Sequence, residues 1–92
     1  MTTDDLLTER GDTHGSFADN GRIAQALKDM IRSGPCWTHL DDIEREALDM
    51  ICSKISRIVS GKLHFADNWQ DIIGYSTLAL EICDDGTPAK ID

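Results

Sequence analysis

Residues 41–61, DDIEREALDMICSKISRIVSG, carry the strongest periodic pattern in this chain of 92 residues. Apolar side chains recur there at the three- and four-residue spacing of an α-helix. Asp41 or Asp42 is suited to cap the start, because a short acidic side chain accepts hydrogen bonds from free backbone N–H groups. Gly61 is suited to end the helix. We therefore expect a long amphipathic helix, whose broad apolar face consists of Ile43, Ala47, Leu48, Ile51, Ile55, Ile58 and Val59.

Two weaker segments of the same kind flank this helix. Within residues 14–34, apolar residues fall at helical spacing, Ser16 is placed to cap the start, and Gly34-Pro35 stops the run. A further helix is expected over about residues 67–83. No segment shows the pattern of a strand. The sequence therefore predicts an all-α domain with three main antiparallel helices.

The two ends of the chain differ from this helical part. Residues 1–13 are polar and predict a flexible arm, whereas residues 84–92 contain Gly, Pro and charges and predict a flexible acidic tail. Residues 14–83 are then a single helical domain. Because so short a chain buries a limited share of its surface, and only 5% of its residues are aromatic, a second subunit is expected to complete the core.

The formal net charge is −8, from 17 acidic and 9 basic residues. This balance disfavours direct binding to nucleic acid, where Lys and Arg supply most of the affinity. It suits a protein that recruits divalent cations or binds a basic partner, although solubility alone explains it as well. No apolar run is long enough for a membrane span. Three cysteines without CxxC spacing indicate reduced thiols and a cytoplasmic location, and Cys52 and Cys83 are expected to be small core residues.

Acidic side chains at helical spacing are candidates for a metal site. Glu46 and Asp49 share one stripe of the 41–61 helix with Ser53 and Arg57, opposite its apolar face. Two carboxylates, a hydroxyl and a guanidinium could bind a metal at one end and a phosphate at the other. Taken alone, the stripe is explained more simply as a charged helix face in solvent.

A second acidic pair opens the following helix, which is apolar on two sides and is expected to pack between neighbours. Asp67 and Asp71 are i, i+4 neighbours, and Asp71 lies at the margin of the buried surface, where a carboxylate needs a cation. Lys54 could pair with Asp71, reach a phosphate, or simply extend to solvent. Asp67 could instead cap the helix. Gly74 is unfavourable inside a helix and suggests that another group approaches the backbone closely there.

The segments HGSFADN, EREALDMICSKISRIVSG and DNWQDIIGY resemble a small family of helical phage and prophage proteins without an assigned function. Over residues 14–82 the pattern is similar in turn to the MazG-like all-α nucleotide pyrophosphatases, which carry ExxE on one helix and ExxD on a later one. Here Glu46-x-x-Asp49 matches the first pair, and Asn68-x-x-Asp71 matches the second with Asn in place of an acid. Asn supplies a neutral oxygen and weakens the charge balance of such a site.

This resemblance implies a metal-dependent nucleotide pyrophosphohydrolase that converts a (deoxy)nucleoside triphosphate into the monophosphate and pyrophosphate. It implies Mg²⁺ or Mn²⁺ as the cofactor, a MazG-like helical bundle, and a homodimer or homotetramer in which a partner subunit completes the site. The roles that it implies are metal binding and catalysis by Glu46, Asp49 and Asp71, further metal binding by Asp67 or Asn68, phosphate binding by Lys54 and Arg57, and base binding by His14, Phe17, Asn20 and Tyr75.

Two other functions stay open. A scaffold of this kind with an altered acidic set could bind nucleotides without cleaving them, as a sequestering protein in anti-defence. The acidic surface could instead occupy a basic groove on a host defence protein, for which the net charge of −8 is the only indication.

Overall fold

The computed structural model of the chain describes residues 2–4 and 15–83. In these ranges it contains three long α-helices and no strand, which confirms the predicted all-α class. The elements are α2 (Phe17–Arg32), the short 3-10 helix η1 (Trp37–His39), α3 (Asp42–Ser60) and α4 (Ala66–Leu80). Most of the arm predicted for residues 1–13, and the tail predicted for 84–92, lie outside the described residues.

The starts of α2 and α3 follow the capping residues of the sequence. The Ser16 hydroxyl accepts a hydrogen bond of 3.1 Å from the backbone N–H of Asp19. At the start of α3, Asp41 and Glu44 form a reciprocal capping box, in which each side chain accepts from the backbone of the other residue. These bonds satisfy backbone N–H groups that have no partner inside a helix.

α4 begins differently from the prediction. Its N-cap is Phe65, which makes no side-chain capping bond, so Asp67 lies inside the first turn and is not the cap. A carboxylate in this turn still interacts favourably with the positive end of the helix dipole. The prediction that Asp67 caps α4 was therefore wrong, because the N-cap position belongs to Phe65.

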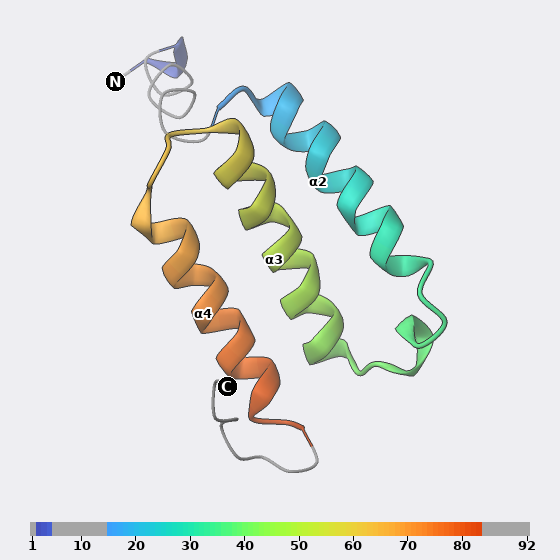
Figure 1. Cartoon of the computed structure of the whole chain (residues 1–92). Helices are drawn as coiled ribbons and strands as arrows, with labels where there is room; N and C mark the ends of the chain where they lie inside the picture. Colours follow the sequence, from blue (N-terminus) through green and yellow to red (C-terminus); the bar gives the residue numbers. More distant parts are fainter. Residues whose placement is uncertain (1, 5–14, 84–92) are drawn as a thin grey trace.

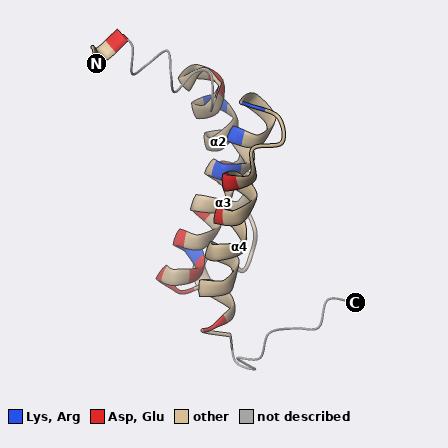
Figure 2. Ribbon diagram, turned by 90° about the vertical axis from the view of Figure 1, so that its left-hand side faces the viewer, with Lys and Arg blue, Asp and Glu red and all other residues tan. Residues whose placement is uncertain are grey.

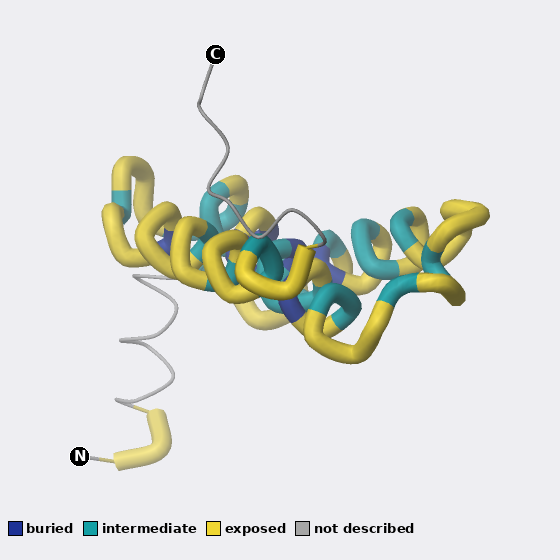
Figure 3. Tube along the Cα trace, turned by 90° about the horizontal axis from the view of Figure 1, so that it is seen from below, coloured by how far each residue is buried: buried dark blue, intermediate teal, exposed yellow. Residues whose placement is uncertain are grey.

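The three helices lie side by side in one layer, with α3 in the middle and successive helices antiparallel (Figure 1). α3 contacts both α2 and α4. Seen from below, the helices form a row rather than a closed bundle (Figure 3). The sequence suggested that the last helix packs between neighbours, but α3 takes that place and α4 lies at an edge of the layer.

This arrangement leaves most of the apolar face of α3 uncovered. Of the predicted members, Ala47 alone is buried, whereas Leu48, Ile55 and Val59 are exposed. The reason is that α3 contacts α2 and α4 along two opposite sides, and its broad apolar face lies between these two contacts. The buried hydrophobic residues of the described ranges are all small, namely Ala24, Ala47 and Cys52.

The connection between α2 and α3 is held by two arginines. Arg45 donates hydrogen bonds to the carbonyl oxygens of Trp37 and Thr38, at 3.2 and 2.8 Å. The Arg32 guanidinium lies over the Trp37 ring, 5.6 Å from its centroid. η1, which the sequence did not predict, is thereby fixed to the helices on both sides.

Cys36, Cys52 and Cys83 are free thiols. Cys52 is buried, as expected, and burial raises its pKa, as does the nearby Asp49 carboxylate, so the thiol stays protonated at neutral pH. Cys83 is exposed, so its predicted core position was wrong, because α4 ends at Leu80. Within the described ranges, no helix has the length and apolar character needed to cross a bilayer.

Gly15 provides a test of how the chain enters α2. Its φ is +81°, and a Cβ at this position would overlap the Ser60 carbonyl at the end of α3. We expect Gly15→Ala to lower the free energy of unfolding by about 2 kcal/mol, measured by urea denaturation. Gly21→Ala is the matched control: nothing lies within 4 Å of its added Cβ, and we expect a gain of about 0.5 kcal/mol. Equal effects would contradict the close approach at Gly15.

Candidate functional site

Two ion pairs connect α3 to its neighbours. On the α2 side, Arg32 Nη2 lies 3.0 and 3.1 Å from the two carboxylate oxygens of Asp49. On the α4 side, Lys54 Nζ lies 2.8 Å from Asp71 Oδ2. Two cations and two carboxylates are therefore held at defined positions along opposite edges of the same helix.

The Lys54–Asp71 pair is asymmetric in its burial. The Lys54 side chain is 11% exposed, whereas that of Asp71 is 47% exposed. A buried ammonium without a counter-charge is costly, so Asp71 stabilises Lys54 in the contact between α3 and α4. Of the three roles that the sequence left open for Lys54, the structure shows the pairing with Asp71.

The stripe of α3 between these two edges carries the other predicted polar residues. Glu46 is exposed, and Ser53 and Arg57 are half-buried. Helical spacing places them on one side of α3, between the edge of Asp49 and the edge of Lys54. We call this side of the layer the polar face and define it by Lys28, Arg32, Glu46, Asp49, Ser53, Arg57, Asp67 and Asp71.

Figure 2 shows the layer edge-on with its charged residues coloured. They are concentrated toward the left and centre of the layer in this view, and its right-hand edge is largely free of them. The contacts between Arg32 and Asp49 and between Lys54 and Asp71 place these four charges toward the same side of the layer.

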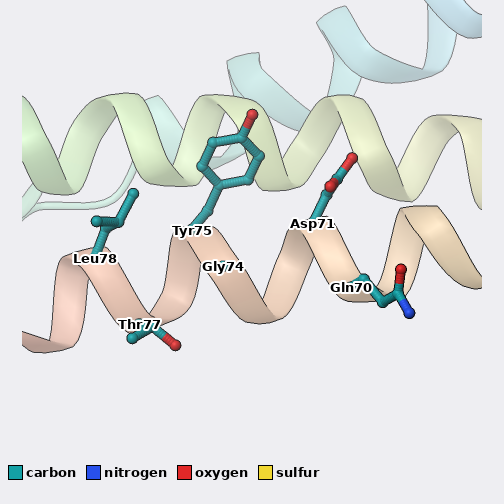
Figure 4. A pocket seen from close by; sticks show the side chains of 6 residues that line it. All are labelled: Gln70, Asp71, Gly74, Tyr75, Thr77 and Leu78. Atoms are coloured by element: carbon teal, nitrogen blue, oxygen red, sulfur yellow. The ribbon is translucent and has the colours of Figure 1, made fainter.

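A groove runs along the contact between α3 and α4, beside the polar face. One part has a volume of about 310 Å³ and is lined by Asp42, Ile43, Glu46, Ala47, Tyr75 and Leu78. The adjoining part has a volume of about 450 Å³ and lies on the surface of α4 alone, where it is lined by Gln70, Asp71, Gly74, Tyr75, Thr77 and Leu78. Tyr75 and Leu78 line both parts. In Figure 4, Asp71, Tyr75 and Leu78 point toward α3, whereas Gln70 and Thr77 point away.

Gly74 lines this groove. The sequence suggested that another group approaches its backbone closely. No atom lies within 4 Å of the position that a Cβ would take there. The expected close approach to its backbone was therefore wrong. The missing side chain instead leaves this part of the groove open between Asp71 and Tyr75.

The proposed metal ligands are not gathered into one cluster. Asp49 and Asp71 each pair with a cation, and Asp67 is exposed in the first turn of α4. Asn68 is 2% exposed, and its side-chain nitrogen has no hydrogen-bond partner among the described residues. In the same ranges, no group of three or more His, Cys, Asp or Glu side chains is placed to hold a metal.

This arrangement decides which kind of metal site these residues fit. Mg²⁺ in nucleotide enzymes commonly uses one or two carboxylates together with water and substrate phosphates. Glu46 with Asp49, or Asp67 with Asp71, offers such a pair on one helix. The residues therefore fit a metal held jointly with a phosphate ligand, and they do not fit a closed protein cage.

The residues proposed for base binding are separated by the length of α3. Phe17 is 90% exposed, and Asn20 is half-buried, in the first turn of α2. This end of α2 follows Gly15, which contacts the C-terminal end of α3. Tyr75 instead shares a groove with Asp42, at the N-terminal end of α3. The antiparallel layer thus separates this set within one chain, and His14 lies outside the described residues.

Sequence reasoning missed two parts of the site. The pairing of Arg32 with Asp49 joins residues 17 positions apart, and no local pattern indicates it. The apolar lining of the groove by Ile43 and Leu78 was also missed, because both residues were assigned to ordinary apolar helix faces.

The model of one protein family, described as a domain of unknown function (DUF6378), matches residues 2–83. The chain belongs to this family. The match includes all three helices and both ion pairs of this DUF6378 protein. No curated protein and no solved structure matches it. The family description carries no activity, so the function has to be argued from the polar face and the groove.

The burial asymmetry of the Lys54–Asp71 pair predicts unequal effects of removing its two members. Asp71→Asn leaves a buried ammonium without a counter-charge, and we expect a loss of about 1–3 kcal/mol in the free energy of unfolding. Lys54→Met keeps most of the side-chain volume and leaves a half-exposed carboxylate that water can solvate, so we expect a change within about 1 kcal/mol.

Urea denaturation of both DUF6378 variants beside the wild type, at unchanged slope m, measures this difference. A larger loss for Lys54→Met than for Asp71→Asn would contradict the assigned order of burial.

Proposed function

We propose that this DUF6378 protein is a metal-dependent nucleotide pyrophosphohydrolase, which converts a (deoxy)nucleoside triphosphate into the monophosphate and pyrophosphate. The observation that carries the proposal is the polar face, where Glu46 and Arg57 lie between the Arg32–Asp49 and Lys54–Asp71 pairs. The similarity of Glu46-x-x-Asp49 and Asn68-x-x-Asp71 to the MazG-like pattern supports the same chemistry.

Three cations are available for the phosphates. Arg57 lies on the stripe between the two ion pairs, and a guanidinium can donate two parallel hydrogen bonds to one phosphate group. Arg32 and Lys54 neutralise Asp49 and Asp71. An incoming triphosphate can accept hydrogen bonds from Arg32, whose side chain is 41% exposed, and Asp49 would then be available as a metal ligand. Lys54, in contrast, keeps its contact with Asp71.

The carboxylates supply the negative end of the site. Glu46 and Asp49 would hold Mg²⁺ or Mn²⁺ jointly with the substrate phosphates, and the metal would neutralise phosphate charge and activate water for attack on the α-phosphorus. Asp71, at the opposite edge of α3, would position Lys54 toward the phosphates. The ion pairs hold Asp49 and Asp71 in place before any ligand binds. That preorganisation reduces the cost of orienting them when the substrate arrives.

The groove beside Tyr75 is the place for the base. The ring lines both parts of the groove, and an aromatic face next to an apolar wall suits base stacking. Asp42 and Glu46 line one part and can accept hydrogen bonds from amino or hydroxyl groups of the nucleoside. Because Phe17 and Asn20 lie near the other end of α3, we assign this role to Tyr75 within one chain.

Pyrophosphate release tests the proposal directly. The full chain is incubated with each of the common NTPs and dNTPs, with Mg²⁺ or Mn²⁺, and with EDTA in parallel. We expect metal-dependent formation of pyrophosphate together with the nucleoside monophosphate from at least one of them. Release of inorganic phosphate together with a nucleoside diphosphate would instead indicate cleavage at the γ-phosphate. The absence of any product from all the nucleotides tested would contradict the proposed enzymatic activity.

Glu46→Gln tests the site without disturbing the fold, because Glu46 is exposed. We expect kcat to fall by about 100-fold or more, since the amide cannot replace an ionised metal ligand. Glu81→Gln is the matched control, because Glu81 is an exposed glutamate at the end of α4 and lies outside the polar face. Circular dichroism checks that both variants are folded. If the folded Glu46→Gln variant keeps the wild-type kcat, the polar face is not the active site.

One observation favours a second candidate, a protein that binds nucleotides without cleaving them. Asn68 stands where the MazG-like pattern has an acid, and it is almost fully buried rather than open to a metal. Equilibrium dialysis against mono-, tri- and cyclic nucleotides separates the two functions. Stoichiometric binding without product formation would support nucleotide sequestration. Dissociation constants above about 1 mM for every nucleotide would contradict it.

A further inference from the structure

The side of the layer opposite the polar face is made of apolar side chains that nothing in the described chain covers. Met30, Leu48, Ile55, Val59, Trp69 and Ile73 are each between 36% and 72% exposed. We call this side the apolar face and define it by Ile23, Leu27, Met30, Leu48, Ile51, Ile55, Val59, Trp69, Ile73 and Leu80.

The three helices contribute to this face from the same side. On α4, the buried Asn68 separates the side of Asp71 from the side of Trp69 and Ile73. On α2, the buried Ala24 separates Arg32 from Met30 in the same way. Since the ion pairs join the polar sides of neighbouring helices, their apolar sides are joined as well, with α3 in the middle.

The area of this face is comparable to one half of a stable interface. Its six most exposed large side chains present on the order of 600 Å² of apolar surface, at about 200 Å² for a fully exposed side chain of this size. The less exposed members add to this area. A standard interface buries about 800 Å² per partner, and monomers rarely leave an apolar patch this large open.

Charge indicates which partner fits. The two charged residues that helical spacing places on the same arcs of α2 and α3, Asp19 and Glu44, lie in the first turns of these helices. The rest of the face is uncharged, so it can meet an identical copy of itself without repulsion or burial of charge. Contact of two polar faces would require desolvation of the charged side chains that define them. The net charge of −8 disfavours adsorption to an anionic lipid surface. A two-fold axis requires the same patch on both subunits, and this patch is self-compatible.

We propose that the apolar face is a homodimer interface, in which a second copy of this chain places its own apolar face against it about a two-fold axis. The polar faces then lie on the two outer surfaces of the dimer. Each copy keeps its own Glu46 and Arg57, so neither site borrows residues of the polar face from the partner. This inference holds whether or not the polar face acts on nucleotides.

Sedimentation equilibrium of the full chain from 1 to 100 μM tests the dimer. We expect a mass of twice the 10.2 kDa of one chain. Val59→Asp places a carboxylate on the apolar face of the middle helix, near the C-terminal end of α3, and we expect dimerisation to weaken by about 100-fold or more. Gln25→Asp is the matched control, because Gln25 is exposed on the side of α2 that carries Lys28 and Arg32, and we expect the wild-type mass.

A monomeric wild type at 100 μM would overturn the proposal, as would a folded Val59→Asp variant that keeps the wild-type dissociation constant. If Val59→Asp does not fold, Trp69 decides the question. In a Trp37→Phe background, acrylamide quenching of Trp69 is expected to rise at least twofold on dilution below the dissociation constant. Quenching that is independent of concentration would overturn the proposal, and a monomer with a protected Trp69 would show that the chain covers its own face.

Discussion

α3 contacts its two neighbours through narrow edges, and this constraint determines both faces of the layer. Its buried residues are small or polar, namely Ala47, Cys52, Lys54 and Ser56. Small side chains let the helices approach closely, and the one long member, Lys54, is stabilised by Asp71 across the contact. Because the contacts use the edges of α3, one remaining side is free to carry charges and the other to carry Leu48, Ile55 and Val59.

The fold class could be predicted from the sequence because local signals decide it. Ser16, Asp41 and Gly61 each stand where a helix begins or ends, and helical spacing of apolar residues was enough to place α2 and α3. The order of packing could not be predicted in the same way. The broad apolar face of α3 suggests a core, but its burial depends on which helices reach it, and spacing along one helix carries no such information.

The candidate site was only partly predictable for a related reason. Glu46, Asp49, Ser53 and Arg57 were recognised because a stripe of one helix is a local property. The pairing of Arg32 with Asp49 is a tertiary contact, and the burial of Asn68 depends on the face that α4 turns toward α3. The motif Asn68-x-x-Asp71 lies on α4, and the structure places its two side chains in different environments, one buried and one half-exposed.

The proposed dimer and the polar face are connected through stability. Burying a fully exposed Leu, Ile, Met or Val contributes about 1.5–3 kcal/mol, so six half-exposed side chains on each copy gain roughly 10 kcal/mol or more on pairing. That gain falls within the range of about 4–15 kcal/mol that association costs, before smaller contacts are added. Because the buried apolar residues of the described ranges are all small, we expect pairing to contribute a large share of the stability. Stability would then depend on protein concentration, and the positions of Asp49 and Asp71 on the outer surface would depend on a contact made on the opposite side of α3.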